Sequence, residues 1–141
     1  MTASATAANL TVLVYSQHPE VRTSVRSAVG RRVAADLGRI DWVECASYSQ
    51  VKDQFDSGEI DLAILDADAQ PTGGMGLSRQ FKNEINDCPP IVVIVAREQD
   101  RWLAAWSQAD AVILRPVDPV AAAATVADTL RAHAAAIPVI G

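Results

Sequence analysis

Two carboxylates follow one short apolar run, and an arginine follows another. The first run is residues 61–65, DLAIL; Asp66 comes directly after it, and Asp68 follows two residues later. A carboxylate in this place is either a turn residue or a reactive group that attacks an electrophile or ligates a hard cation. Arg115 follows the run AVIL, and a guanidinium can bind a carboxylate through two hydrogen bonds. The chemistry of Asp66 therefore depends on what the fold places beside it.

Five apolar runs occur along the chain at regular intervals, and each predicts a β-strand. Four of them are apolar on both faces and too short for helices, which is typical of central strands in a covered parallel sheet. Residues 40–46 alternate apolar and polar side chains, as an edge strand does. The four runs that are apolar on both faces are residues 10–15, 61–65, 91–95 and 111–114.

Segments with helical spacing separate these strands. Residues 19–29 begin with a proline and end before Gly30, and residues 119–136 begin with a proline after Asp118. Three shorter segments have the same character, and the glycine cluster at residues 72–76 is expected to be a flexible loop. The shorter helices are predicted at residues 49–58, 77–86 and 100–108.

Five consecutive βα units predict an α/β protein of one domain. The expected architecture is a flavodoxin-like, doubly wound (βα)5 three-layer sandwich whose parallel sheet has the order 2-1-3-4-5. The domain covers residues 10–136, with an N-terminal arm at residues 1–9 and an apolar C-terminal tail at residues 137–141.

In such a fold the site lies outside the carboxyl ends of the strands. The residues expected there are Ser16 and Gln17 after the first strand, Asp66 after the third, Val95 at the end of the fourth and Arg115 after the fifth. None of the serine, histidine or cysteine residues forms a nucleophile pattern, so an enzyme is not expected.

Composition excludes several classes of partner. The formal net charge is −5 with no cluster of lysine or arginine, which disfavours direct binding of nucleic acid. No stretch is long and apolar enough for membrane insertion, and no secretion signal is visible, so a cytoplasmic location is expected. Cys45 and Cys88 have no partner at metal-ligand spacing, which predicts structural thiols and no metal site.

The chain resembles a stand-alone, chemotaxis-type response-regulator receiver domain over residues 10–136. The resemblance is carried by VLVYSQHPEVR, IDLAILDADAQPTGGMGL, IVVIVARE and AVILRPVDP, in this order and spacing. It implies that Asp66 occupies the position of the aspartate that accepts a phosphoryl group from a histidine kinase. It also implies a bacterial two-component phosphorelay as the setting, with Mg²⁺ on two acidic residues, a lysine, a hydroxyl and a mobile aromatic ring as helpers.

The sequence departs from this family at each helper position. Ser16 and Gln17 stand in place of the acidic pair, so Mg²⁺ binding is expected to be weak or lost, and no other cofactor is expected. Val95 replaces the hydroxyl residue and Val112 the aromatic one, while Arg115 replaces the lysine. The chain is therefore expected to be a degenerate, atypical pseudo-receiver.

Three roles remain open for Asp66. In the first role, Asp66 is still phosphorylated, and the Asp68 carboxylate serves as a ligand of the metal ion. Alternatively, Asp66 and Arg115 form a standing ion pair that replaces phosphate and lysine, or Asp66 only caps its loop. The ion pair is the favoured interpretation.

The predicted helix at residues 100–108 offers a candidate partner surface. If Trp102 faces the sheet, then Leu103 and Trp106 fall on the outer face, where aromatic side chains commonly anchor protein interfaces. The alternative is that both pack under a neighbouring loop or helix.

The last helix and the tail extend this candidate surface. With Val120 facing inward, the outer face of the helix carries small side chains in place of charged ones, although a composition merely rich in alanine explains the same pattern. The predicted interface residues here are Ala121, Ala122, Thr125, Thr129, Ile137, Val139 and Ile140.

These features predict a phosphorylation-independent protein-interaction module that serves as a regulatory or accessory subunit of a larger assembly. The first alternative is a conventional single-domain response regulator phosphorylated on Asp66 by a histidine kinase. The second alternative, from another class, is a small nucleotide- or flavin-binding protein.

Overall fold

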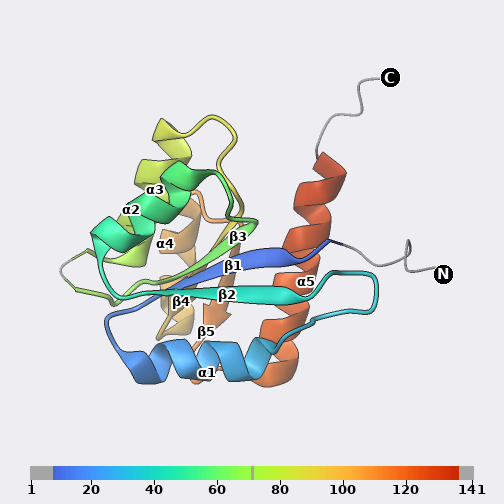
Figure 1. Cartoon of the computed structure of the whole chain (residues 1–141). Helices are drawn as coiled ribbons and strands as arrows, with labels where there is room; N and C mark the ends of the chain where they lie inside the picture. The colour runs from blue at the N-terminus through green and yellow to red at the C-terminus, as the bar shows by residue number, and fades with distance from the viewer. Residues whose placement is uncertain (1–7, 71, 137–141) are drawn as a thin grey trace.

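The computed structural model describes residues 8–70 and 72–136 of the chain (Figure 1). Strands and helices alternate along its whole length, as the apolar runs predict. The strands are β1 (Leu10–Tyr15), β2 (Ile40–Cys45), β3 (Leu62–Asp66), β4 (Ile91–Val95) and β5 (Ala111–Leu114). The helices are α1 (Pro19–Val29), α2 (Tyr48–Ser57), α3 (Gly74–Glu84), α4 (Arg101–Trp106) and α5 (Pro119–Ala136), with a short 3₁₀ turn, η2 (Glu98–Asp100), before α4.

The five strands form one parallel sheet in the order β2-β1-β3-β4-β5, which confirms the predicted topology. β2 lies at one edge, as its alternating pattern indicates, and β5 lies at the other. The register pairs Tyr15 of β1 with Leu65 of β3, so both strands end at the same level. Parallel strands therefore present the residues that follow them at a common edge.

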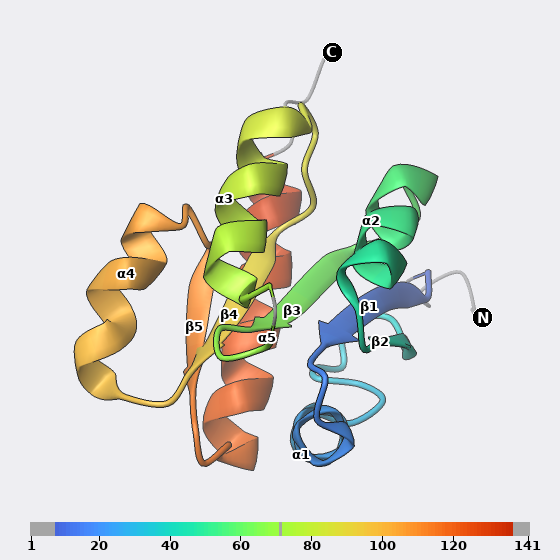
Figure 2. The same cartoon turned by 90° about the vertical axis from the view of Figure 1, so that its left-hand side faces the viewer.

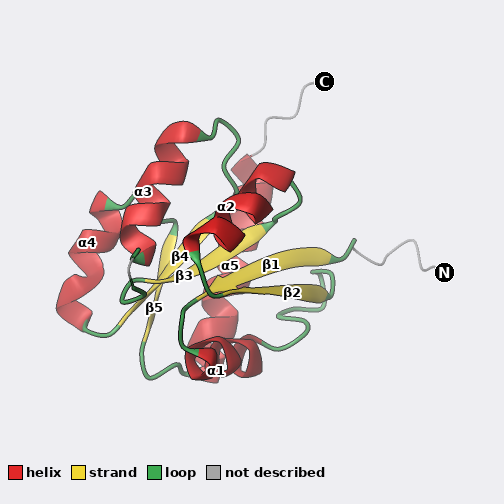
Figure 3. Cartoon of the chain, turned by 60° about the vertical axis from the view of Figure 1, so that its left-hand side comes forward, coloured by secondary structure: helices red, strands yellow, loops and turns green. Residues whose placement is uncertain are grey.

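Helices cover both faces of the sheet and create two separate cores (Figure 3). The alternation of side chains along each strand divides them between these cores: Leu13 and Tyr15 of β1 enter one, whereas Val12 and Val14 enter the other. The first core is closed by α2, α3 and α4, and the second by α1 and α5. The result is the expected three-layer sandwich.

Helix α3 begins earlier than predicted. The glycine cluster expected to be a flexible loop supplies its first turn, because Gly74 lies directly against the backbone at the end of β3. A Cβ on Gly74 would lie 2.8 Å from the carbonyl oxygen of Asp66 and 2.8 Å from the Cβ of Leu65. A side chain would prevent this approach, so glycine permits α3 to pack next to Asp66.

Helix α4 is turned differently from the prediction. Its buried positions are Ala104 and Ser107, which immediately follows the helix, whereas Trp102, predicted to face the sheet, is 70% exposed. Leu103, predicted to lie outside, is partly buried. The physical reason is a close contact with α3, in which the Ser78 hydroxyl donates to the carbonyl of Ser107 at 2.8 Å. Small side chains allow this approach, and an indole ring does not.

Helix α5 also differs from the prediction at its first turn. Val120, predicted to face inward, is 79% exposed, whereas Val126 is fully buried. Ala122 and Thr129, predicted to lie on the outer face, are both buried. They are small enough to let α5 lie close to the sheet and to α1, and the Thr129 hydroxyl donates to the carbonyl of Thr125 within the helix.

Both cysteines are free thiols. Cys45 is buried at the end of β2, and burial raises the pKa of its thiol to about 11. Burial likewise raises the pKa of the Cys88 thiol. A raised pKa keeps both side chains as neutral thiols, which suits the structural role predicted for them.

Candidate functional site

The candidate site lies where β1 and β3 end side by side. Ser16 follows β1 and Asp66 ends β3, and the Ser16 hydroxyl donates a hydrogen bond of 2.7 Å to Oδ2 of Asp66. Both residues are fully buried. The sheet register brings them together, because β1 and β3 are adjacent parallel strands. Ser16 immediately follows the end of β1, and Asp66 is the last residue of β3.

The second carboxylate oxygen of Asp66 is held by the loop after β3. Oδ1 accepts a hydrogen bond of 2.9 Å from the backbone N–H of Asp68, two residues further along the chain. The backbone N–H of Ala69 donates to the Asp66 carbonyl at 3.2 Å. Asp66 thus forms an Asx turn, the local geometry of a loop-capping aspartate.

Arg115 does not pair with Asp66, and the favoured ion pair is wrong. Its Nη2 lies 2.8 Å from Oδ2 of Asp68 instead. Asp66 lies below the surface with both oxygens engaged, whereas Asp68 is exposed and Arg115 is only partly buried. The Arg115 guanidinium therefore pairs with the more accessible of the two carboxylates, that of Asp68. Within residues 8–70 and 72–136, no cationic side chain forms an ion pair with Asp66.

The loop after β1 is tied to the loop after β3. The Ser16 hydroxyl also accepts a hydrogen bond of 3.1 Å from the backbone N–H of His18. The side-chain carbonyl of Gln17 accepts a hydrogen bond from the backbone N–H of Gln70. The side-chain oxygens of Ser16 and Gln17, which stand in the acidic-pair positions, are therefore already engaged in hydrogen bonds within the chain.

Tyr15 contributes to the site although sequence reasoning did not single it out. Its hydroxyl donates a hydrogen bond of 2.7 Å to the carbonyl of Thr72, in the loop that leads to α3. Burial, and then the negative charge of Asp66, raise the pKa of this phenol above its usual range. The available signal was a tyrosine as the last residue of a buried strand, directly before Ser16.

Apolar side chains occupy the remaining helper positions. Val95 is buried at the end of β4, and Val112 of β5 is partly buried against the core below α2, α3 and α4. The backbone N–H of Arg115 donates to the carbonyl of Val95 at 2.9 Å, which brings the two strand ends together. Neither valine can donate a hydrogen bond to a bound anion.

Exposed aromatic rings mark the outer face of α4, which lies beside β5 (Figure 2). Trp102 is 70% exposed and Trp106 is 50% exposed. The guanidinium of Arg79, on α3, lies 4.7 Å from the centre of the Trp106 ring and donates a hydrogen bond of 2.8 Å to the Trp106 carbonyl. These contacts orient Trp106 while leaving half of its surface open.

A groove runs between β5 and α5, next to α4. It comprises two adjoining pockets of about 240 and 520 Å³, and both are lined by Arg101, Val112 and Thr125. Ala121 and Ala122 line the smaller pocket, and Thr129 lines the larger one. Of the predicted interface residues, Ile137, Val139 and Ile140 lie outside the described residues.

Metal-ligating side chains do not gather anywhere in the described ranges. Within residues 8–70 and 72–136, no three histidine, cysteine, aspartate or glutamate side chains lie close enough to hold one metal ion. In the same ranges, no helix is both long and apolar enough to span a membrane.

Comparison with known proteins places this geometry in one family. The chain is 48% identical over 125 residues to an uncharacterized response regulatory protein of Mycobacterium tuberculosis, in strain CDC 1551 and in strain H37Rv. The match covers 89% of this chain and 94% of the mycobacterial protein. No protein-family model matches the chain.

Solved structures share the fold at much lower sequence identity. The receiver domain of Francisella response regulator 1452 superposes with a TM-score of 0.73 at 13% identity, over 88% of this chain and 98% of that one. A CheY-like response regulator receiver domain protein from Methanospirillum hungatei superposes with a TM-score of 0.70 at 13% identity, over 91% and 98%. The resemblance noted in the sequence is confirmed: this chain belongs to the response regulator family and is a receiver domain.

Proposed function

We propose that this receiver domain is a phosphorylation-independent protein-interaction module, acting as a regulatory or accessory subunit of a larger assembly. The observation that carries the proposal is the state of Asp66. Its carboxylate is fully buried, and each oxygen already accepts a hydrogen bond from the chain itself, from Ser16 and from Asp68. A phosphoryl donor would have to reach this buried group and compete with these contacts.

The donor set around Asp66 suits Mg²⁺ poorly. A hard divalent cation prefers several charged oxygen ligands, and the neutral Ser16 and Gln17 stand in their place. The oxygens of both residues are engaged in hydrogen bonds, and Asp68 is paired with Arg115. Without a divalent cation, attack of a carboxylate on an anionic phosphoryl group lacks its main charge stabilisation.

Helix α4 is held to α3 by side-chain hydrogen bonds as well as by packing. This supports the proposal that α4 presents its outer face to a partner in one fixed arrangement. Ser78 and Arg79 of α3 donate to the carbonyls of Ser107 and Trp106. The Ser78 hydrogen bond is buried, and a buried hydrogen bond favours one arrangement of the two helices. The exposed rings of α4 and the groove between β5 and α5 would thus be available without a phosphorylation step.

The first test is direct phosphorylation in vitro. With acetyl phosphate and Mg²⁺, the intact mass of the protein is expected to stay unchanged, because the residues beside Asp66 suit Mg²⁺ poorly. A receiver domain that retains the acidic pair, treated in parallel, should gain the mass of one phosphoryl group.

A mass gain that disappears in Asp66→Asn would contradict the proposal and favour the alternative function. That alternative is a conventional response regulator phosphorylated by a histidine kinase, and the position of Asp66 at the end of β3 is the observation in its favour. The same measurement therefore separates the two functions.

The second test concerns the partner surface on α4. Affinity purification followed by mass spectrometry is expected to recover a stable protein partner, and Trp102→Ala or Trp106→Ala should weaken its binding about tenfold or more, because exposed aromatic rings commonly dominate interface energies. Glu59→Ala is the control, since Glu59 is exposed and lies outside α4 and α5.

Circular dichroism and thermal unfolding should show that all three variants remain folded. A partner that both tryptophan variants retain at wild-type strength would place the interface elsewhere on the domain. A partner that the Glu59→Ala variant also loses would argue against a specific role of α4.

A further inference from the structure

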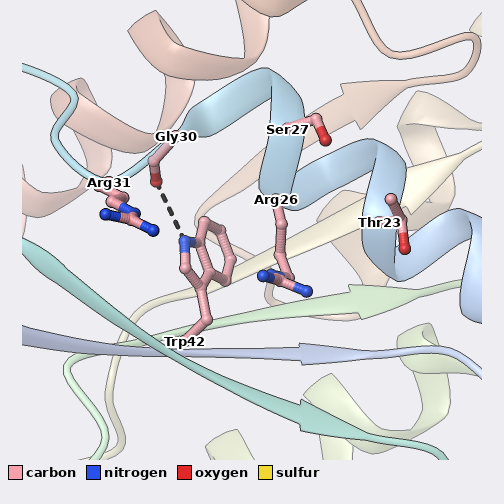
Figure 4. Close-up of a pocket in the computed structure, with 6 residues that line it drawn as sticks. All are labelled: Thr23, Arg26, Ser27, Gly30, Arg31 and Trp42. Carbon is pink, nitrogen blue, oxygen red and sulfur yellow. Dashed lines mark hydrogen bonds between the residues drawn. The ribbon is translucent and has the colours of Figure 1, made fainter.

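A pocket lies at the opposite edge of the sheet from β5, between the end of α1 and the edge strand β2 (Figure 4). Its volume is about 270 Å³. The site at Asp66 does not include it. The lining residues are Thr23, Arg26, Ser27, Gly30, Arg31 and Trp42.

The indole ring of Trp42 is fixed in this pocket by the backbone. Gly30 ends α1 with a φ of 80°, a conformation that glycine adopts at low cost, and its carbonyl accepts a hydrogen bond of 3.0 Å from Nε1 of Trp42. Trp42 is only partly buried, so part of its ring is available to a ligand. A ring held in one orientation can stack on a planar group without losing further side-chain entropy.

The pocket has an excess of positive charge, although the whole chain is acidic. Arg22 and Arg26 share the single carboxylate of Glu44, at 3.0 and 2.7 Å. Arg31 makes no ion pair with any residue in the described ranges, while its backbone carbonyl is anchored by the N–H of Ile40 at 2.7 Å. Of the two guanidinium groups that line the pocket, that of Arg26 is therefore already paired with Glu44, and that of Arg31 remains available for an anion.

Figure 4 shows how these groups are disposed. In this view the indole of Trp42 stands between the guanidinium groups of Arg26 and Arg31, and the hydroxyls of Thr23 and Ser27 lie along the neighbouring face of α1. Arginine donors bind phosphate oxygens well, and hydroxyls can add further hydrogen bonds. The combination matches a small ligand with one planar ring and one phosphoryl group.

We propose that this pocket binds a nucleoside monophosphate, with the base against Trp42 and the phosphate held by the guanidinium of Arg31. Ligand pockets usually measure about 300–1,000 Å³, and this pocket of about 270 Å³ lies just below that range, which favours a mononucleotide over a dinucleotide. The net charge of −5 disfavours a longer nucleic acid, whose many phosphates the rest of the surface would repel. The proposal does not depend on the function proposed for α4, because β2 and β5 are opposite edges of the sheet.

Isothermal titration calorimetry with adenosine 5′-monophosphate and guanosine 5′-monophosphate tests this site. At least one nucleotide should bind, and inorganic phosphate or the nucleoside alone should bind at least about tenfold more weakly, since each makes only part of the contacts. Arg31→Gln should weaken nucleotide binding about tenfold, the usual effect of removing a charge-assisted hydrogen bond.

Arg39→Gln is the matched control, because Arg39 is exposed, carries the same charge and does not line the pocket. Trp42→Leu provides a second variant, and loss of one indole resonance in the NMR spectrum identifies the signal that should shift on nucleotide addition. The proposal would be overturned by the absence of binding at millimolar nucleotide, by equal affinities in Arg31→Gln and Arg39→Gln, or by binding of a single-stranded oligonucleotide without binding of the mononucleotide.

Discussion

Replacing Gly74 with valine is expected to lower the free energy of unfolding by roughly 3 kcal/mol, because the new side chain has no room. The Cβ alone would meet backbone atoms of Leu65 and Asp66 at 2.8 Å, and backbone cannot move aside as a flexible side chain can. For a domain of this size the melting temperature should fall by about 10 °C. Urea unfolding followed by circular dichroism measures the change.

Gly76→Ala is the control in the same helix. A Cβ at Gly76 meets nothing within 4 Å, and alanine has a higher helix propensity than glycine, so the variant should be as stable as the wild type or up to about 1 kcal/mol more stable. Equal losses in Gly74→Val and Gly76→Ala would contradict the role given to the close contact between Gly74 and β3.

Removing the ring of Phe81 is expected to have the largest effect on stability of any change considered. Phe81 of α3 is almost fully buried and stacks on Phe55 of α2, with ring centres 4.3 Å apart and planes 14° apart. Phe81→Ala should lower the free energy of unfolding by about 3–5 kcal/mol, through lost burial and the cavity left behind. Thermal and chemical unfolding would both report this loss.

A double-mutant cycle with Phe55→Ala separates stacking from burial. The two rings should show a coupling of about 0.5–1.5 kcal/mol, so that the double variant loses less than the sum of the single losses. Val120→Ala serves as the control because Val120 is largely exposed, and it should change stability by no more than about 0.5 kcal/mol. A small effect of Phe81→Ala, similar to that of Val120→Ala, would contradict the observed core.

Both changes bear on the proposed function through α3. This helix packs on the end of β3, where Asp66 lies, and it donates the hydrogen bonds that hold α4. A variant that loosens α3 should therefore disturb the Asp66 site and the α4 surface together. The proposed function needs both to be held in one arrangement.

The arrangement around Asp66 also changes the interpretation of Arg115. The sequence suggested an ion pair between Arg115 and the carboxylate of Asp66, whereas Arg115 pairs with Asp68 at the surface. Surface ion pairs usually contribute at most about 1 kcal/mol, so this contact is a weak restraint on the loop. The hydrogen bonds from Ser16 and Asp68 are what hold the buried group.

Helix orientation is where sequence reasoning was least successful. Short apolar helices can place several different stripes toward a sheet, and hydrophobicity alone favoured burying Trp102 and Val120. Both are exposed, whereas the small Ala104 and Ala122 are buried where α4 and α5 pack against the rest of the domain. Which stripe is buried thus depends on the neighbouring helix, which the local pattern does not contain.

The sequence by itself determined the strands, their parallel order and the position of Asp66 at a strand end, since runs apolar on both faces can only be satisfied inside a covered sheet. Together with the family resemblance, it also predicts that the acidic pair, the hydroxyl and the aromatic ring are missing, because this prediction follows from residue identity. Only the tertiary structure decided that Asp66 bonds to Ser16 and not to Arg115, and that Trp42 and Arg31 line a common pocket. Those contacts join residues distant in the chain, and their partners are set by packing and depth of burial.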